Sequence, residues 1–308
     1  MASQLGGGGP PAEPGAPRRG RLYVVATPIG NLGDITLRAL ETLRAVALVA
    51  AEDTRRTGAL LRHFRIDTPL VSYHAHNRVA RLPRLLAALA QGDLALVSDA
   101  GTPAISDPGQ ELIAAAGAAG HEIVAVPGPS APIAALAVSG LSASLFHCAG
   151  FLPRRASQRR RCLAQMAGWP GTLILFEAPH RLRGTLADLL DVLGDRQVAV
   201  CCELTKLFEQ VLRTTLAAAA AHFQAVEPRG EFTLVVAGAG TLEQRTPEAP
   251  PSARLRQRYA ALLSQLGDRK QALRALAAET RLPRKTLYAA LLAPDAAGPR
   301  ASPRKAPP

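Results

Sequence analysis

Short apolar runs alternate with segments of helical periodicity along most of this 308-residue chain. Several runs are apolar at nearly every position, which is typical of strands that helices cover on both faces. The alternation predicts an α/β fold with a largely parallel sheet. Expected strands are residues 22–26, 45–51, 94–98, 122–126, 172–176, 197–202 and 231–237, and expected helices include 55–64, 78–91, 109–119, 181–193 and 215–225.

Changes in composition divide the chain into five predicted parts. Gly, Pro, Ala and Arg without periodicity predict flexible tails at residues 1–20 and 294–308. A Gly- and Ser-containing stretch followed by a basic segment predicts a junction between two α/β domains, 21–140 and 141–245. A Pro-rich linker then leads into a helical module over residues 253–293.

Basic residues are concentrated at the C-terminus. The formal net charge is +12. Residues 251–308 hold twelve Lys and Arg against three acidic residues, a net charge of +9, and residues 1–21 add +2, so the middle of the chain carries only +1. The end of the helical module resembles a helix-turn-helix, with Arg284 and Lys285 on its last helix. A basic surface attracts nucleic acid or anionic membranes. The alternative is a small helical cap whose charged face is simply solvated.

The sequence also limits the class of protein. It lacks the roughly 20 consecutive apolar residues of a membrane helix, and no apolar core of a signal peptide follows its first residues. Its four cysteines have no CxxC spacing, which argues against a zinc site or a disulfide framework. We therefore expect a soluble protein of the reduced cytoplasm, without a bound metal.

Three loops at predicted strand ends are rich in Gly and Pro: residues 26–34, 98–109 and 126–131. Ligands of doubly wound α/β domains bind at this end of the strands. Glycine lets the backbone approach a ligand, and proline fixes the backbone beforehand. The alternative for any one such loop is ordinary turn chemistry, but three of them together predict a pocket for a ligand of nucleoside size.

The loops also indicate which ligand the pocket does not take. No GxGxxG opens a helix after a strand, and no GxxxxGK[ST] loop is present, so dinucleotides and nucleoside triphosphates are disfavoured. The loops contain Asp34, Asp99 and Asp107 but no Lys or Arg. Acidic loops fit a cationic or zwitterionic nucleoside better than a phosphate.

An ordered set of motifs resembles one family. VATPIGNLGDITLRAL, EDTRRTGALL, SYHAHN, LVSDAGTPAISDPG, VPGPSA, SGL, GFLP, FEAPHR, ELTKLFE and GEFTLVVAG occur in that order. They resemble the ribosomal RNA small subunit methyltransferase I family, over roughly residues 21–292, and thereby the tetrapyrrole-methylase superfamily. The resemblance implies two α/β domains with S-adenosylmethionine in the cleft between them. It also implies 2′-O-methylation of a cytidine in 16S rRNA at the decoding centre, acting on the 30S subunit as a homodimer.

The resemblance further implies roles for individual residues. The implied cofactor-binding residues are Pro28, Ala100, Gly101, Thr102, Ile105, Ser130, Ala131, Phe176 and Leu204. A ribose hydroxyl is a weak nucleophile, so a base or a cation near it is expected, and the candidates are Asp53, Glu177, Glu203 and Lys206. Residues expected to bind RNA phosphates are Arg55, Arg56, Arg154, Arg155, Arg159, Arg181, Arg284 and Lys285. For each acidic candidate the alternative is a structural ion pair with a neighbouring arginine.

Two other functions fit parts of the sequence. One is a methyltransferase of the same fold that acts on a tetrapyrrole, although such a substrate does not require the EDTRRT and FEAPHR motifs or a basic C-terminal module. The other is a non-enzymatic nucleic-acid binder in which the α/β part senses a ligand. The three functions differ in whether the protein transfers a methyl group and in which molecule receives it.

Overall fold

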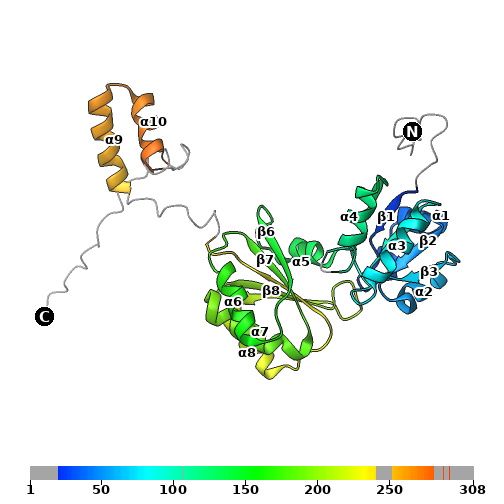
Figure 1. Ribbon diagram of the computed structural model, residues 1–308. Coiled ribbons are helices and arrows are strands. Elements are labelled where there is room, and N and C mark those ends of the chain that lie inside the picture. The colour runs from blue at the N-terminus through cyan, green and yellow to red at the C-terminus, as the bar shows by residue number, and fades with distance from the viewer. Residues whose placement is uncertain (1–19, 106, 241–251, 281–286, 288–290, 292–308) are drawn as a thin grey trace. The chain divides into compact units, whose positions relative to one another are not determined.

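The computed structural model describes residues 20–105, 107–240, 252–280, 287 and 291. Compact packing divides the chain into two units, Met1–Gly238 and Ala239–Pro308. The first unit contains two α/β halves, each built on a five-stranded sheet (Figure 1). Within the described residues, no helix has the length and hydropathy needed to cross a membrane.

The first sheet is parallel throughout, as the alternation predicts. Its strands are β1 (Leu22–Val25), β2 (Leu48–Ala51), β3 (Leu70–Ser72), β4 (Leu94–Val97) and β5 (Ile123–Val126), in the order β3-β2-β4-β1-β5. Alternate residues of β4 enter different cores: Leu94 and Leu96 pack on one face of the sheet, and Ala95 and Val97 on the other. Burial on both faces explains why the strand is apolar at every position.

Helices α1 (Leu37–Ala45), α2 (Thr54–His63), α3 (Arg78–Leu89) and α4 (Gln110–Ala118) belong to the first half, together with the short turn η1 (Leu32–Asp34). Local capping fixes two of their starts. The Thr36 hydroxyl accepts from the N–H of Ala39, and the Asp53 carboxylate accepts from the N–H of Arg55. The helix starts after β1 and β2 are therefore set by residues close in sequence, which holds the adjoining loops at the sheet edge.

The second sheet is mixed, which corrects the prediction of a largely parallel sheet for this half. Its strands are β6 (Phe146–Phe151), β7 (Thr172–Glu177), β8 (Gln197–Cys202), β9 (Gln210–Thr215) and β10 (Phe232–Val236), in the order β6-β7-β10-β8-β9. Only β6 and β7 run parallel, and the other neighbours are antiparallel. The connection from β8 to β9 is too short for the crossover helix that a parallel pair requires.

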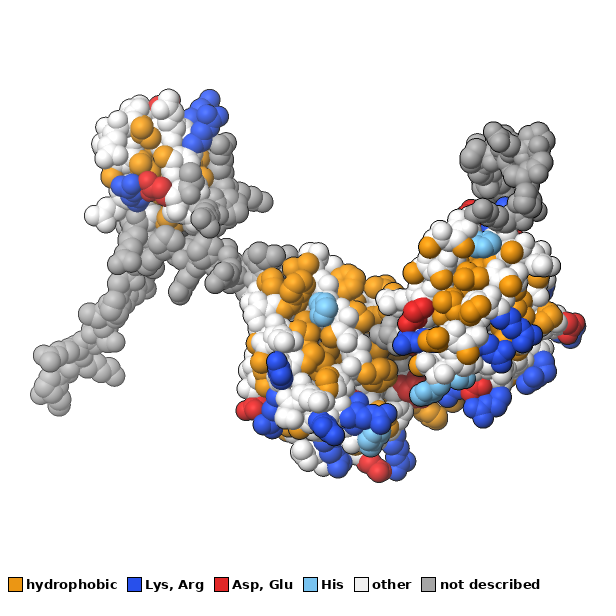
Figure 2. Space-filling model, in the orientation of Figure 1, with side chains coloured by type: hydrophobic (Ala, Val, Ile, Leu, Met, Phe, Trp, Pro, Cys, Tyr) orange, Lys and Arg blue, Asp and Glu red, His pale blue; other side chains and the backbone are white. Residues whose placement is uncertain are grey.

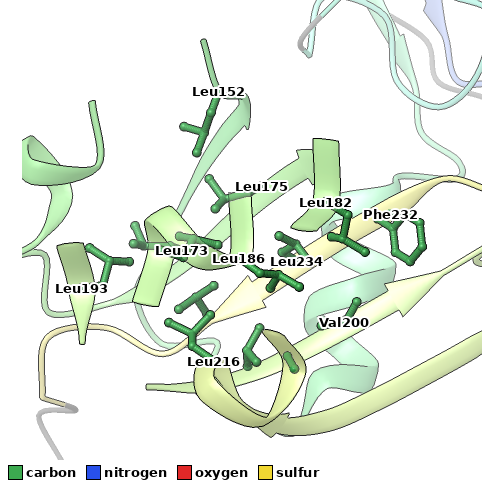
Figure 3. Packing of buried hydrophobic residues seen from close by; sticks show 14 of the residues in the cluster. Leu152, Leu173, Leu175, Leu182, Leu186, Leu193, Val200, Leu216, Phe232 and Leu234 are labelled. Carbon is green, nitrogen blue, oxygen red and sulfur yellow. The ribbon is translucent and has the colours of Figure 1, made fainter. Parts of the chain in front are cut away.

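Helices cover both faces of the second sheet. On one face lie α6 (Ala156–Met166), α7 (Pro179–Leu193) and α8 (Leu216–Ala225), and Figure 3 shows leucines of this core, such as Leu182 and Leu186, directed at the sheet. On the other face lies α5 (Ala131–Ser139), whose Ala135 and Leu136 pack with Ile174 and Cys201. Because α5 directly follows β5, one continuous segment joins the first sheet to the core of the second.

The arginine run that the sequence placed in a connection lies in and before α6. Arg159 is only 7% exposed. Its Nε donates to the Asp188 carboxylate over 2.7 Å, and Arg160 donates to the other oxygen of Asp188 over 2.5 Å. Asp188 thus joins α7 to α6 through two charge-assisted hydrogen bonds, of which the one from Arg159 is buried.

The second unit contains α9 (Ser252–Leu266) and α10 (Arg269–Thr280), which pack through a small leucine core that includes Leu262 and Leu276. Arg258 on α9 and Glu279 on α10 form an ion pair at 2.7 Å. These two helices agree with the predicted helical module. Of the predicted third helix, only Leu287 and Leu291 are described, and both belong to this core.

Candidate active site

The loops after β1, β4 and β5 meet at one edge of the first sheet. The N–H of Thr27 donates to the carbonyl of Gly101 over 2.9 Å, and the N–H of Gly101 donates back to the carbonyl of Thr27 over 3.0 Å. The Thr102 hydroxyl donates to the carbonyl of Pro129 over 3.4 Å. The three Gly- and Pro-rich loops are therefore tied together at the edge where α/β proteins bind ligands.

Gly101 is the residue that permits this junction. Its φ of +80° lies in the left-handed region, which costs a residue with a Cβ about 1–3 kcal/mol. A Cβ built on Gly101 would also approach the Ile29 side chain to 3.4 Å. Glycine thus permits the left-handed backbone conformation and keeps the space beside Ile29 open.

A hollow of about 460 Å³, which we call the first hollow, opens beside these loops and extends to β7 and β10 of the second sheet. Its volume lies within the range of small-molecule sites. Seven of the nine predicted cofactor-binding residues line it: Ala100, Gly101, Thr102, Ile105, Ser130, Ala131 and Phe176.

The other two predicted cofactor-binding residues lie elsewhere. Leu204 is 9% exposed and packs with Ala135 and Leu136 of α5, so it supports the wall rather than forming it. Pro28 lines a neighbouring hollow of about 510 Å³, the second hollow. The second hollow is also lined by Ala59 and His63 of α2 and by Lys206.

Several lining residues were missed by sequence reasoning. Phe151 at the end of β6 is 61% exposed, and its ring lies 5.4 Å from that of Phe176 between centroids. Ile29 and Glu231 line both hollows. The available signal was that each of these residues lies within a quoted motif, but Phe and Ile in such places are more often core residues.

Five acidic residues line the first hollow: Glu52, Asp99, Asp107, Glu177 and Glu231. Burial, together with the negative charge of Glu52, raises the pKa of Asp107 to about 6. Burial likewise raises the pKa of Glu52. Carboxylates of this kind gain from a positively charged ligand, because it offsets the cost of their ionisation inside the hollow.

Replacing Asp107 with asparagine should stabilise the protein at pH 7.5 and do so less at pH 5. The folded state holds a proton on Asp107 up to about pH 6, whereas an unfolded aspartate loses it near pH 4. Stability contributed by this proton is therefore present at low pH and lost as the pH rises through 6. Thermal denaturation at both pH values measures the effect, with exposed Asp67→Asn as control. Equal shifts at the two pH values would contradict it.

Two of the predicted catalytic residues, Asp53 and Glu177, are held by partners within the protein. Asp53 caps α2 and pairs with Arg55 at 2.6 Å, and hydrogen bonds from Arg55 hold the pKa of this carboxyl well below its usual range. Glu177 is 2% exposed. One of its oxygens accepts from the Thr185 hydroxyl over 2.5 Å, and the other accepts from the N–H of Ala178 over 2.8 Å.

The other two predicted catalytic residues form one cluster with Glu231. The Lys206 ammonium donates to Glu203 over 2.9 Å and to Glu231 over 3.0 Å. The N–H of Glu231 donates to Glu203 over 2.8 Å. The hydrogen bond from Lys206 lowers the pKa of Glu203. Lys206 lies in the wall of the second hollow.

The predicted RNA-binding arginines differ in accessibility. Arg55, Arg56, Arg154 and Arg155 are exposed, and Arg56 lines both hollows. Figure 2 shows basic side chains on the visible face of both α/β halves.

The prediction of phosphate binding does not fit Arg159 or Arg181. Arg159 is buried against Asp188. The Arg181 guanidinium donates to the carbonyls of Leu152 and Pro153 over 2.7 and 3.3 Å, and its Nε lies 3.2 Å from Glu177. Arg284 and Lys285 lie outside the described residues.

Comparison with solved structures supports the fold. A cobalt precorrin-4 methyltransferase superposes with a TM-score of 0.54 and 17% identity, covering 70% of this chain and 94% of that one. A uroporphyrin-III C-methyltransferase from Thermus thermophilus, complexed with S-adenyl homocysteine, gives a TM-score of 0.51 and 20% identity over 71% of this chain and 97% of that one. At these identities the likeness concerns the fold alone.

Sequence comparison is more specific. The model of the Tetrapyrrole (Corrin/Porphyrin) Methylases matches residues 21–220. A ribosomal RNA small subunit methyltransferase I from Synechocystis is 52% identical over 284 residues, covering 91% of this chain and 100% of the relative. A protein of the same name from Xylella fastidiosa is 47% identical over 87% of this chain and 98% of the relative. The chain therefore belongs to the ribosomal RNA small subunit methyltransferase I family of the tetrapyrrole methylases.

Proposed function

We propose that this protein methylates the ribose 2′-oxygen of a cytidine in 16S rRNA, at the decoding centre of the 30S subunit. Family membership supports a methyltransferase acting on small-subunit rRNA. The cytidine and its 2′-oxygen are the finer part of the proposal and come from the motif resemblance, which also favours a homodimer. The observation that carries the proposal is the first hollow, where seven residues implied by that resemblance meet.

The cofactor is S-adenosylmethionine, and the first hollow suits it chemically. Gly101 and Ala131 contribute small residues to its lining, Phe176 offers an aromatic wall, and five acidic residues supply negative charge. When bound, the cofactor would supply an electrophilic methyl group carried by a positively charged sulfur. A cation of nucleoside size matches both the volume and the charge of this hollow.

We propose that Lys206 and Glu203 belong to the catalytic cluster, whereas Asp53 and Glu177 serve the structure. Lys206 lines the second hollow, and Glu203 accepts from it and from the backbone of Glu231. Positioning of two reactants is worth effective molarities of about 10⁵–10⁸ M. A large part of the rate enhancement therefore requires only that the walls of the site hold the two reactants in position. The cluster of Lys206 and Glu203 would assist the acceptor hydroxyl.

Exposed cations are proposed to hold the RNA. Arg55, Arg56, Arg154 and Arg155 are accessible on the first unit. The second unit exposes Arg258, Arg269, Lys270 and Arg274 on α9 and α10. Contacts of this kind position RNA through its phosphates and are weakened by salt. We propose the helical module as an rRNA-binding module on this basis.

The test is methylation of ribosomal particles by the purified full chain. Labelled S-adenosylmethionine is supplied with 30S subunits from a strain that lacks the endogenous activity, and the modified nucleotide is mapped by its resistance to alkaline cleavage. We expect label on one cytidine ribose, and more on 30S subunits than on naked 16S rRNA, because shaped RNA is what proteins recognise. Label on a base, or none in RNA, would overturn the proposal.

A chain ending at residue 250 is the second arm of the same experiment. It should bind S-adenosylhomocysteine as the full chain does, because the first hollow lies within the first unit. It should bind 30S subunits more weakly and with a smaller salt dependence. Label transferred to a tetrapyrrole would favour the alternative enzyme, and cofactor binding without turnover, with tight duplex DNA binding, would favour the non-enzymatic binder.

A further inference from the structure

The two hollows share a wall. Ile29, Arg56, Asp99, Ala100 and Glu231 line both of them. Two ligands, one in each hollow, would meet at these five residues. Group transfer requires reacting atoms about 3–3.5 Å apart, and adjoining hollows with a common wall provide such a meeting point.

We propose that the second hollow receives the ribose of the acceptor nucleotide, with Glu231 accepting the proton of its 2′-hydroxyl and Lys206 binding the same oxygen. The inference rests on the proposed function, because it takes a ribose as the acceptor. In the balanced step the 2′-oxygen gains the methyl carbon, the electron pair of the broken carbon–sulfur bond stays on sulfur, and the hydroxyl proton passes to the Glu231 carboxylate.

Glu231 is better placed for this role than Glu203. The Glu231 side chain is 78% exposed, and within the described residues its carboxylate has one ion-pair partner, Lys206. The Glu203 side chain is 22% exposed, and one of its oxygens already accepts from Lys206 and from the N–H of Glu231. Glu231 therefore retains oxygen lone pairs for a further donor, and it alone of the two lines the shared wall.

Lys206 is held in its charged form. Burial alone would lower the pKa of this ammonium, but hydrogen bonds to Glu203 and Glu231 outweigh burial and raise the pKa above its usual value. A lysine that keeps its proton cannot act as the base. It can stabilise the negative charge that develops on a hydroxyl oxygen, which leaves the proton to a carboxylate.

The Lys206 side chain packs closely against the loop after β1. A Cβ on Gly30 would lie 2.5 Å from the Cγ of Lys206, so the loop after β1 must carry glycine there for the lysine stem to pass. Glu203 and Thr205 adopt left-handed φ values of +52° and +67°. The N–H of Thr205 donates to the Glu209 carboxylate over 2.6 Å. Such strained residues persist where the surroundings hold them, and they are frequent at functional sites.

Filling each hollow in turn tests where the two ligands lie. Ala59 lines only the second hollow and Ala131 only the first. We expect Ala59→Trp to leave the affinity for S-adenosylhomocysteine, measured by calorimetry, within about twofold of wild type while methylation of 30S subunits falls at least about 100-fold. Ala131→Trp should instead abolish calorimetric binding. A large loss of S-adenosylhomocysteine affinity in Ala59→Trp would overturn the assignment of the second hollow.

Removing the carboxylate tests Glu231 itself. Glu231→Gln should lower the single-turnover rate at saturating 30S subunits about 10²–10⁴-fold, the usual contribution of a general base. The acidic limb of the pH–rate profile should disappear, and the affinities for S-adenosylhomocysteine and 30S subunits should be unchanged. Glu227→Gln is the matched control, because Glu227 is exposed, pairs with Arg229 at 2.8 Å and lines neither hollow.

The outcomes separate this inference from the proposed function. If the wild-type protein labels no cytidine ribose, the proposed function fails. If the wild type labels the ribose and Glu231→Gln keeps more than about a third of the rate, only the role of Glu231 fails. A Glu231→Gln rate that falls while the acidic limb persists would make Glu231 a structural residue and overturn its role as proton acceptor.

Discussion

Replacing Asp188 with alanine should lower the free energy of unfolding of the first unit by about 3–5 kcal/mol, the cost of leaving a buried charge without its partner. The Arg159 and Asp188 side chains are 8% and 3% exposed, and their closest atoms lie 2.6 Å apart. Alanine would leave the Arg159 guanidinium buried beside α7 with no carboxylate. It would also remove a hydrogen bond from Arg160.

Asp191→Ala is the matched control for this change. Asp191 lies on the same helix and faces the same arginine, Arg160, but at 3.8 Å and with its side chain 66% exposed. Exposed pairs of this kind contribute about 0–1 kcal/mol. Urea denaturation followed by circular dichroism measures both variants. If the free energies of unfolding of Asp188→Ala and Asp191→Ala differ by less than about 1 kcal/mol, the buried Arg159–Asp188 pair does not stabilise the packing of α6 against α7.

Replacing Gly101 with valine should weaken S-adenosylhomocysteine binding by about 10–100-fold. A β-branched residue resists the left-handed φ of +80° at this position, and strain of about 1–3 kcal/mol favours displacement of the loop. Displacement breaks the paired hydrogen bonds between Thr27 and Gly101 and moves Thr102 and Ile105 in the wall of the first hollow. Each 1.4 kcal/mol lost corresponds to tenfold in affinity.

Gly140→Val controls for the strain alone. Gly140 ends α5 with a φ of +77°, nearly the same as that of Gly101, and a Cβ there would meet no atom within 4 Å. We expect both variants to lose thermal stability and only Gly101→Val to lose calorimetric affinity. Equal affinity in the two variants would mean that the loop of Gly101 does not form the cofactor wall.

Elements with a strong local signal could be predicted from the sequence. Seven of the strands are apolar at nearly every position, and all of them except the edge strand β5 are largely buried, as expected. The missed strands are different. β3 spans only Leu70–Ser72, β6 contains His147 and Gly150 with an irregular register, and β9 lies at the sheet edge with none of its residues fully buried. Their pairing is decided by neighbours distant in sequence.

The site shows the same division. The three loops beside the first hollow could be located from their Gly and Pro content, because these residues act on the local backbone, whereas the individual lining residues came from the motif resemblance. The partners of charged residues could not. Arg159 reaches Asp188 over 29 positions, and the Glu231 carboxylate reaches Lys206 over 25. The sequence does not distinguish an arginine or a carboxylate that faces solvent from one that pairs with a residue distant in the chain.

Helix α5 has a consequence for how the first unit can be divided. Its first turn lies beside the first hollow, where Ser130 and Ala131 form part of the wall, and its body packs in the core of the second sheet through Ala135 and Leu136. A fragment ending at residue 140 would carry an apolar helix with nothing to cover it, and the complementary fragment would expose one face of its sheet. By its packing, α5 belongs with the second half, which favours a junction between the halves in the Val126–Ser130 loop rather than at residue 140, where the composition of the sequence placed it.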